Sequence, residues 1–337
     1  MSTMKVWQCR LLAGPIEKQL FLATSGVPKP KVTNEILVQV YSAALNPIDY
    51  KMLELGLITK AIFWSPVTPG LDFCGRVVEV GTKVDSFRVG DMVYGSSSGV
   101  FGYGTLAQFV PVSQDVVALV PEGVKVDDVA SIAVVGMTTY QGLKPYAKAG
   151  DKVFINGGSG GTGVLAIQIA KALGYEVTAS CSAANVELCK SLGADEVLDY
   201  QSADIVKQLQ KGGQVFNLVL DNVGSPANLY KASHTFLVPN GTFVQIGGGM
   251  SLSAITQLAS SMMRPAFLGG GKRKYVFVTA KANTTDFEQL VAWMKEGKIR
   301  AVIDSTFEFN EAPKAFERLK TGRARGKIVV HVKESSG

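Results

Sequence analysis

Short apolar runs and helical periods alternate through the middle of the chain, from about Val153 to Gly247. Apolar runs rich in β-branched residues are typical of strands, while apolar positions three and four residues apart are typical of helices. The pattern predicts strands at 153–156, 176–181, 196–200, 217–221 and 242–247, with helices at 164–171, 186–192 and 204–209. Alternation at this spacing predicts parallel βαβ units, with helices on both faces of one sheet.

The segments on either side have a different pattern. Strand-like runs at 35–41, 75–81 and 91–95 are separated by glycine and proline turns, which predicts a mostly β, partly closed sheet. A helix is predicted at 287–294. The strand-and-turn pattern then returns in the segments 307–309, 312–319 and 327–332. We therefore predict a first domain at 1–125, an inserted α/β domain at 126–269 and a segment at 270–337 that completes the first domain. A ligand cleft is expected between the two domains.

Composition is that of an ordinary globular protein, with 337 residues, 47% hydrophobic and 18% charged. No apolar stretch is long enough to cross a membrane, and the N-terminus carries no recognisable targeting peptide, so a cytoplasmic protein without membrane insertion is expected. The net charge of +6 comes from scattered basic residues, which argues against nucleic acid and favours an anionic ligand. Four cysteines without CxxC spacing and two histidines predict neither a disulfide framework nor a zinc cluster.

The strongest single motif is a glycine turn at 157–163, placed between the predicted strand 153–156 and the predicted helix 164–171. A strand, a glycine-rich turn and a helix together present bare backbone N–H groups to the pyrophosphate of a dinucleotide. Glycine is required because a Cβ would hold the phosphate away. The residues predicted to bind the cofactor here are Gly158, Gly160, Gly161, Thr162 and Gly163.

The end of the second strand of the α/β domain indicates which dinucleotide binds. An acidic residue there would accept both ribose hydroxyls and select NAD. The residues at 180–185 are neutral and rich in hydrogen-bond donors, which favours NADPH. Ser180, Ser182 and Asn185 are predicted to hold its 2′-phosphate.

Six segments in order resemble the medium-chain dehydrogenase/reductase superfamily. They are Asn46-Pro47-Ile48-Asp49-Tyr50-Lys51, Pro69 to Gly75, Val89 to Val93 with the glycine turn, Leu192-Gly193-Ala194-Asp195, and Gly326 to Val330. The most similar branch is that of the zinc-free quinone oxidoreductases and the alkenal- or enone-reducing enzymes. This resemblance implies a Rossmann doubly wound parallel sheet and a mostly β GroES-like catalytic domain.

Catalytic zinc needs three protein ligands and an open position. The family's first ligand cysteine corresponds to Asn46 here, its Gly-His-Glu corresponds to Gly70-Leu71-Asp72, and its four-cysteine lobe is absent. No metal is therefore expected.

Hydride added to the far carbon of an activated C=C leaves negative charge on the conjugated oxygen, where hydrogen-bond donors lower the barrier. The resemblance implies Lys51 and Thr138 as these catalytic donors, with Tyr50 as a candidate proton donor. The cofactor-binding residues that it adds are Asn46, Asp49, Tyr200, Asn222, Gly247, Gly248 and Lys327. It also implies a homodimer across the last strand of the cofactor domain. The catalytic tyrosine of mitochondrial enoyl reductases has no counterpart in Glu54-Leu55-Gly56-Leu57.

Three functions follow. The first is an NADPH-dependent, zinc-independent oxidoreductase that reduces quinones or the C=C of α,β-unsaturated carbonyls. Its substrates would be small apolar electrophiles. The alternatives are a trans-acting enoyl reductase that serves a polyketide or fatty-acid synthase, with a carrier protein as partner, and a non-catalytic NADPH-binding sensor. The uncharged stretch 250–263 fits a substrate pocket, a buried helix or a dimer contact.

Overall fold

The computed structural model of the chain describes residues 2–10, 14–30, 33–55, 66–97, 102–247, 256, 261 and 270–333. The chain forms two compact units: unit 1 comprises Met1–Val134, Ala282–Glu296 and Ala301–Gly337, and unit 2 comprises Val135–Lys281 and Gly297–Arg300. Both main breaks lie further along the chain than residues 125 and 269. The backbone N–H of Val134 donates to the Asp72 carboxylate at 2.9 Å, which ties the first half of helix α4 (Val126–Leu143) to unit 1.

A six-stranded parallel sheet forms the centre of unit 2, in the order β10-β9-β8-β11-β12-β13. Its strands are β8 (Lys152–Asn156), β9 (Glu176–Cys181), β10 (Glu196–Asp199), β11 (Phe216–Asp221), β12 (Leu237–Gln245) and β13 (Lys274–Phe277). Chain order reverses between β8 and β11, and open α/β sheets bind ligands at the carboxyl edge of such a point. The predicted doubly wound parallel sheet is confirmed.

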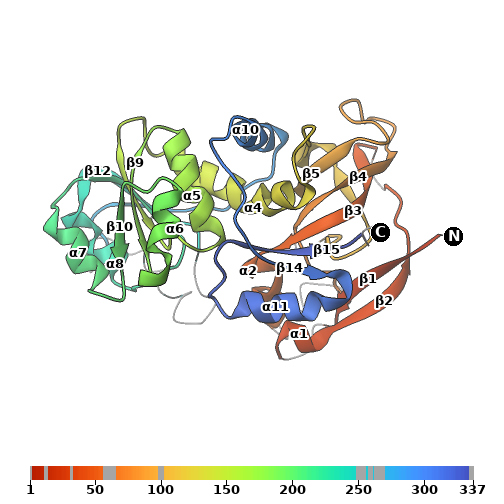
Figure 1. Cartoon of the computed structure of the whole chain (residues 1–337), viewed down its shortest axis with the longest axis horizontal. Helices are drawn as coiled ribbons and strands as arrows, with labels where there is room; N and C mark the ends of the chain where they lie inside the picture. Colours follow the sequence, from red (N-terminus) through yellow and green to blue (C-terminus); the bar gives the residue numbers. More distant parts are fainter. Residues whose placement is uncertain are drawn as a thin grey trace. The chain divides into compact units, whose positions relative to one another are not determined.

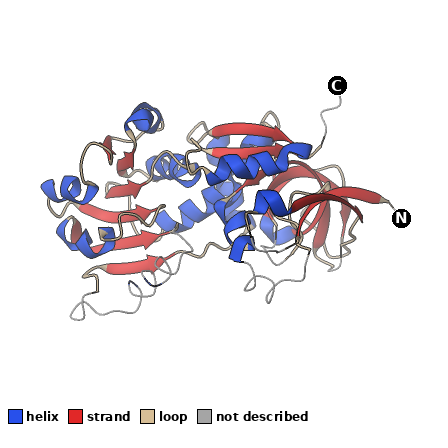
Figure 2. Cartoon of the chain, turned by 90° about the horizontal axis from the view of Figure 1, so that it is seen from below, coloured by secondary structure: helices blue, strands red, loops and turns tan. Residues whose placement is uncertain are grey.

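Four helices and two 3-10 turns follow these strands. They are α5 (Gly161–Ala172), η3 (Ala183–Asn185), α6 (Val186–Ser191), α7 (Ile205–Lys211), α8 (Leu229–Ala232) and η4 (Ser233–Thr235). Figure 1 shows them around the strands of unit 2, and Figure 2 shows the same strands side by side between helices. The sheet buries both faces: Phe154, Val219 and Phe243 on one face and Ile155, Leu220 and Val244 on the other are each at most 1% exposed. This explains the continuous apolar runs of the sequence.

Unit 1 is built on a seven-stranded sheet in the order β14-β15-β3-β4-β5-β7, with β6 also paired to β3. Its strands are β3 (Glu35–Leu45), β4 (Asp72–Val80), β5 (Met92–Ser96), β6 (Phe109–Ser113), β7 (Val117–Leu119), β14 (Ile303–Glu308) and β15 (Lys327–His331). Strands β1 (Thr3–Cys9) and β2 (Leu20–Gly26) form a separate antiparallel pair. The C-terminal strand β15 pairs antiparallel with β3, so strands that come before and after unit 2 in the sequence share one sheet.

Short helices cover the strands of unit 1. They are α1 (Ile16–Gln19), α2 (Pro47–Lys51), η1 (Leu53–Leu55), η2 (Gln114–Val116), α10 (Thr284–Lys295), η6 (Phe309–Glu311) and α11 (Ala312–Lys320). Phe316 of α11 is fully buried in one apolar cluster with Val38, Phe73 and Ile328. Within the described ranges, no helix is both long enough and apolar enough to cross a bilayer.

Candidate active site

The glycine turn of unit 2 joins β8 to α5, and two constraints require its glycines. Gly157 has a φ of +84°, in the left-handed region. A Cβ on Gly163 would lie 2.0 Å from the carbonyl oxygen of Gly157, so helix and turn approach too closely for any side chain. A Cβ on Gly160 meets no protein atom within 4 Å. The turn is therefore open at Gly160, beside the first residue of α5, where helix N–H groups favour an anion.

Two further positions on the same sheet form a close-packed pair. Asn222 follows β11, and among the described residues neither polar atom of its buried side chain has a hydrogen-bond partner. A Cβ on Gly247, after β12, would lie 1.9 Å from the Asn222 carbonyl oxygen. A buried amide without a partner costs free energy unless a ligand satisfies it. Together with the glycine turn, these residues fit a dinucleotide; Gly248 lies outside the described residues.

The residues beyond β9 present hydroxyl and amide groups. Asn185 Nδ2 lies 3.1 Å from both Ser159 Oγ and Ser182 Oγ, which links the 180–185 segment to the glycine turn. Tyr200 follows β10 and is 54% exposed, with its backbone N–H donating to the Cys181 carbonyl. No carboxylate stands among residues 180–185, so nothing in this segment would repel a phosphate.

Ser180 lies deeper than its neighbours. It is 1% exposed, and its hydroxyl bonds to the side chain of Asn156 at the end of β8. Asn156 bonds in turn to Asp221 at the end of β11. Sequence reasoning missed Asn156 and Asp221, although each is a polar residue that ends an apolar run.

Unit 1 contains a buried polar centre made by residues distant in sequence. Lys327 Nζ donates to Asn46 Oδ1 at 2.6 Å and to Asp72 Oδ2 at 2.9 Å, and Asn46 Nδ2 donates to the same carboxylate oxygen at 3.0 Å. The exposed fractions of these three residues are 4%, 3% and 0%. With the N–H of Val134 on its other oxygen, the Asp72 carboxylate has charged or amide donors on both oxygens. Sequence reasoning selected Asn46 and Lys327 singly and missed Asp72 as their common partner.

The sequence Asn46-Pro47-Ile48-Asp49 explains the start of α2. Asn46 is the N-cap, Pro47 stands at the first helical position, and Asp49 Oδ2 accepts the backbone N–H of Asn46 at 2.7 Å. This capping box fixes the direction in which α2 leaves β3. The same turn therefore holds the Asn46 amide against Lys327.

Asp49 is the most perturbed acid of this centre. Its side chain is fully buried, and its Oδ1 has no hydrogen-bond partner among the described residues. Burial raises its pKa to about 7, and nearby Asp72 adds to this, while the Asn46 N–H and Lys327 act in the opposite direction. A carboxyl that titrates near neutrality is typical of a functional site.

The three predicted catalytic residues lie on two helices. Tyr50 and Lys51 end α2 in unit 1, while Thr138 belongs to the part of α4 in unit 2. Burial lowers the pKa of Lys51, and burial, with Glu54, raises the pKa of Tyr50 against the opposing effect of Lys320. That these residues act together on one substrate stays a prediction.

By the family resemblance, Asn46 and Leu71 are predicted to stand where zinc dehydrogenases have metal ligands, and this correspondence stays a prediction. In the part of the chain that the structure describes, no group of three or more His, Cys, Asp and Glu residues could hold a metal ion. The ammonium of Lys327 instead neutralises Asp72.

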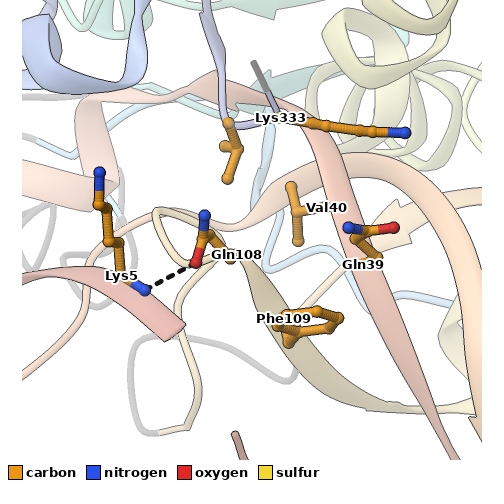
Figure 3. Close-up of a pocket in the computed structure, with 7 residues that line it drawn as sticks. Lys5, Gln39, Val40, Gln108, Phe109 and Lys333 are labelled. Atoms are coloured by element: carbon orange, nitrogen blue, oxygen red, sulfur yellow. Dashed lines mark hydrogen bonds between the residues drawn. The ribbon is translucent and has the colours of Figure 1, made fainter. Parts of the chain in front are cut away.

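A separate cavity of about 350 Å³ lies on another part of unit 1 (Figure 3). Lys5, Gln39, Val40, Gln108, Phe109 and Lys333 line it, with Val332. The backbone N–H of Lys5 donates to Gln108 Oε1 at 2.8 Å. None of the predicted site residues lines this cavity.

The α/β unit with its glycine turn, and the β unit with its polar centre, define an oxidoreductase of the alcohol dehydrogenase type. Two family models match the chain: one described as zinc-binding dehydrogenase at residues 192–330, and one described as alcohol dehydrogenase GroES-like domain at residues 32–122. The chain belongs to the medium-chain dehydrogenase/reductase superfamily, in its zinc-free branch.

Three relatives illustrate this branch. The trans-enoyl reductase pgmF of Aspergillus terreus is 42% identical over 99% of this chain and 98% of its own length. The human mitochondrial NAD(P)H oxidoreductase RTN4IP1 is 33% identical over 89% of this chain and 82% of its own. The solved quinone oxidoreductase of Coxiella burnetii is 30% identical, covers 98% of this chain and 100% of its own, and superposes with a TM-score of 0.86.

Proposed function

We propose that the chain is an NADPH-dependent, zinc-independent oxidoreductase that delivers hydride to quinones or to the C=C of α,β-unsaturated carbonyls. The observation that carries this proposal is the buried network of Asn46, Asp72 and Lys327. Its side chains satisfy one another, so a substrate oxygen would rely on hydrogen-bond donors rather than on a metal ligand set. A conjugated acceptor suits such a site, because the negative charge that it develops is already spread to its oxygen.

The nucleotide would bind along the carboxyl edge of the sheet in unit 2. The glycine turn and the start of α5 would hold the pyrophosphate, and the unsatisfied amide of Asn222 would bond to the bound ligand. Ser182, Asn185 and Tyr200 would face the 2′-phosphate, which the absence of a carboxylate permits. When bound, the dihydronicotinamide supplies the hydride.

The chain's own residues would handle charge and protons. Lys51 and Thr138 would donate hydrogen bonds to the substrate oxygen as it gains negative charge. Tyr50 would hold its proton at neutral pH, as an unperturbed phenol does, and would be the candidate proton donor; burial raises its pKa, which makes it a weaker acid than an ordinary tyrosine. Asn46, Asp49 and Lys327 would form one wall of the nicotinamide site.

A second candidate is a trans-acting enoyl reductase for a polyketide or fatty-acid synthase, with an acyl carrier protein as partner. It is favoured by the similarity to the trans-enoyl reductase pgmF, which matches almost the whole chain at 42% identity. Since the reaction again adds hydride to a conjugated C=C, the same residues would serve. A non-catalytic NADPH sensor is the third reading, and it predicts binding without turnover.

The assembly that we propose is a homodimer across β13, the edge strand of the sheet in unit 2. Its Phe277 is 37% exposed, which leaves an aromatic ring available to a second copy. The proposed location is the cytoplasm. Light scattering of the purified protein tests the dimer.

The function is tested by NADPH and NADH oxidation with three acceptors: a quinone, a short enone and an enoyl thioester. We expect turnover with NADPH that Lys51→Ala or Thr138→Val lowers by about a hundredfold, the usual scale for losing one stabilising donor. Lys83→Ala, an exposed lysine in unit 1, is the control and should leave the rate unchanged. Preference for the thioester would select the second candidate, and binding without turnover would select the sensor.

A further inference from the structure

A chain of buried polar side chains crosses three neighbouring strands of unit 2 at their carboxyl ends. Asn156 ends β8, Ser180 is the next-to-last residue of β9, and Asp221 ends β11. Their exposed fractions are 5%, 1% and 3%. Buried polar groups persist where each is fully hydrogen-bonded, and such networks specify one arrangement.

The hydrogen bonds between these polar side chains have a fixed donor-to-acceptor direction. The Asp221 carboxylate accepts from the backbone N–H groups of Val223 and Gly224 and from Asn156 Nδ2, at 2.9 to 3.0 Å. Asn156 Nδ2 also donates to the Ser225 carbonyl at 2.7 Å. Both of these partners can only accept, so they fix which end of the Asn156 amide is NH₂. Its Oδ1 must then face Ser180.

The direction continues into the glycine turn. The Ser180 hydroxyl donates to Asn156 Oδ1 at 2.8 Å and accepts the backbone N–H of Gly157 at 3.0 Å. The backbone N–H of Gly158 donates to the Ser180 carbonyl at 2.7 Å. The first two peptides of the turn are thus both held by Ser180, at the residue where φ turns positive.

We propose that Asn156, Ser180 and Asp221 are positioning residues that set the glycine turn for a dinucleotide, and that Ser180 makes no contact with the 2′-phosphate. Its only proton is donated to Asn156, its oxygen accepts the N–H of Gly157, and the residue is 1% exposed. This inference rests on the proposed nucleotide binding. It replaces the direct phosphate role predicted for Ser180 and leaves that role to Ser182, Asn185 and Tyr200.

The two roles of Ser180 differ in which nucleotide they affect. A phosphate contact serves NADPH alone, whereas the shape of the turn serves the pyrophosphate of NADPH and NADH alike. We expect Ser180→Ala to raise the dissociation constants of both by the same factor, about tenfold for one lost buried hydrogen bond. Ser182→Ala is the matched comparison and should weaken NADPH selectively. Fluorescence titration of the apoprotein measures all four constants.

The outcomes separate the two proposals. Ser180→Ala weakening only NADPH, or neither nucleotide, would overturn the positioning role while leaving the proposed function intact. A wild-type chain that binds neither nucleotide would overturn the proposed function, and this inference with it. Thermal unfolding of each variant checks that it is folded.

A second variant tests the hydrogen-bonded network of Asn156, Ser180 and Asp221 without removing a side chain. In Asn156→Asp a carboxylate oxygen replaces Nδ2, 2.9 Å from the Asp221 carboxylate. The two acids can share one proton at low pH but repel each other once both are ionised. We expect the nucleotide affinity of this variant, divided by that of the wild type at the same pH, to fall at least tenfold from pH 6 to 8.5.

The swapped double variant Asn156→Asp/Asp221→Asn restores one acid and one amide, and it should remove the pH dependence. Among the described residues, Tyr275 of β13 is a titratable group that interacts with Asp221; burial raises its pKa, so it keeps its proton across this range. An affinity of Asn156→Asp, divided by that of the wild type, that does not change with pH would overturn the inference.

Discussion

Lys327 and Asp72 form a buried ion pair, and replacing either residue alone would destabilise the folded protein. Their side chains are 4% and 0% exposed, and the Nζ–Oδ2 distance is 2.9 Å. Removing one partner leaves the charge of the other buried and unpaired. Breaking such a pair lowers the free energy of unfolding by about 3–5 kcal/mol. We predict that Lys327→Met lowers the free energy of unfolding by this amount, measured by urea titration.

The double variant Asp72→Asn/Lys327→Met should recover much of that loss, because no charge is then left unpaired. Lys314→Met, in an exposed pair with Glu311, is the control and should show no measurable change. If Lys327→Met behaved like this control, the buried ion pair would not be a stabilising feature of unit 1.

Asp49 gives the protein a distinct pH dependence. Its pKa is raised by burial from 3.8 to about 7, so the folded state binds a proton that the unfolded state releases between these values. Stability from this group is therefore greatest at low pH and falls as pH rises from about 4 to 7. We predict that Asp49→Asn removes this slope and is the more stable protein at pH 8, by roughly 1–4 kcal/mol. Equal slopes in the two proteins would contradict the assignment.

At this scale, single residues were predictable and their partners were not. Asn46 and Asp49 stand in a short local motif whose spacing is that of a helix cap. Asp72 pairs with Lys327 across 255 positions, and no local pattern shows which lysine faces which acid. Asn156 and Asp221 could have been found as polar ends of apolar strands, since parallel strands bring their carboxyl ends to one edge.

In the glycine turn, one glycine is required by the packing of the protein itself, and another by the space that a ligand would need. A Cβ on Gly163 meets the Gly157 carbonyl at 2.0 Å, while a Cβ on Gly160, where φ is −78°, meets nothing. We predict that Gly163→Ala lowers both the melting temperature and nucleotide affinity. Gly160→Ala should keep the melting temperature and weaken only nucleotide binding, because its methyl group would enter the space of the pyrophosphate. Differential scanning fluorimetry with and without NADPH measures both effects.

The opposite pattern, with Gly160→Ala unfolding the protein and Gly163→Ala tolerated, would contradict the geometry of the turn. Equal nucleotide affinity in Gly160→Ala and the wild type would place the pyrophosphate elsewhere.

Elements with strong periodicity were predictable. The segment 176–181 is β9 as expected, and the predicted helix at 204–209 corresponds to α7. The start of the chain reads as a strand, but its pairing with β2 was not predicted, because β2 has no fully buried residue. The predicted substrate-side segment 250–263 falls almost entirely outside the described residues.

For the whole molecule, His331 is a second group that makes the free energy of unfolding depend on pH. Burial opposes its charged form, but hydrogen bonds to Asp127 at 2.9 Å and Glu308 at 3.4 Å outweigh burial and raise its pKa. The stabilisation is complete below about pH 6.5 and is lost as pH rises through the raised pKa. Because the ring is partly exposed, we expect a contribution of only a few tenths to about 1 kcal/mol.

We therefore predict that the free energy of unfolding declines from pH 6 to 8, and that His331→Gln reduces this decline. His234→Gln, which alters the other histidine of the chain, is the control. Urea unfolding at several pH values measures the slopes. A slope that His331→Gln leaves unchanged would contradict the predicted role of the Asp127 and Glu308 contacts.

The central claim is that this chain moves hydride from NADPH to the far carbon of a conjugated acceptor through hydrogen-bond donors of its own. The most direct test uses NADPH carrying deuterium at either face of C4, with an enone or enoyl thioester as acceptor and mass spectrometry of the product. We predict deuterium on the carbon β to the carbonyl from one labelled face only, and about a hundredfold slower formation of this labelled product after Lys51→Ala. Turnover that leaves this carbon unlabelled, or NADPH binding with no reduced product, would contradict the account.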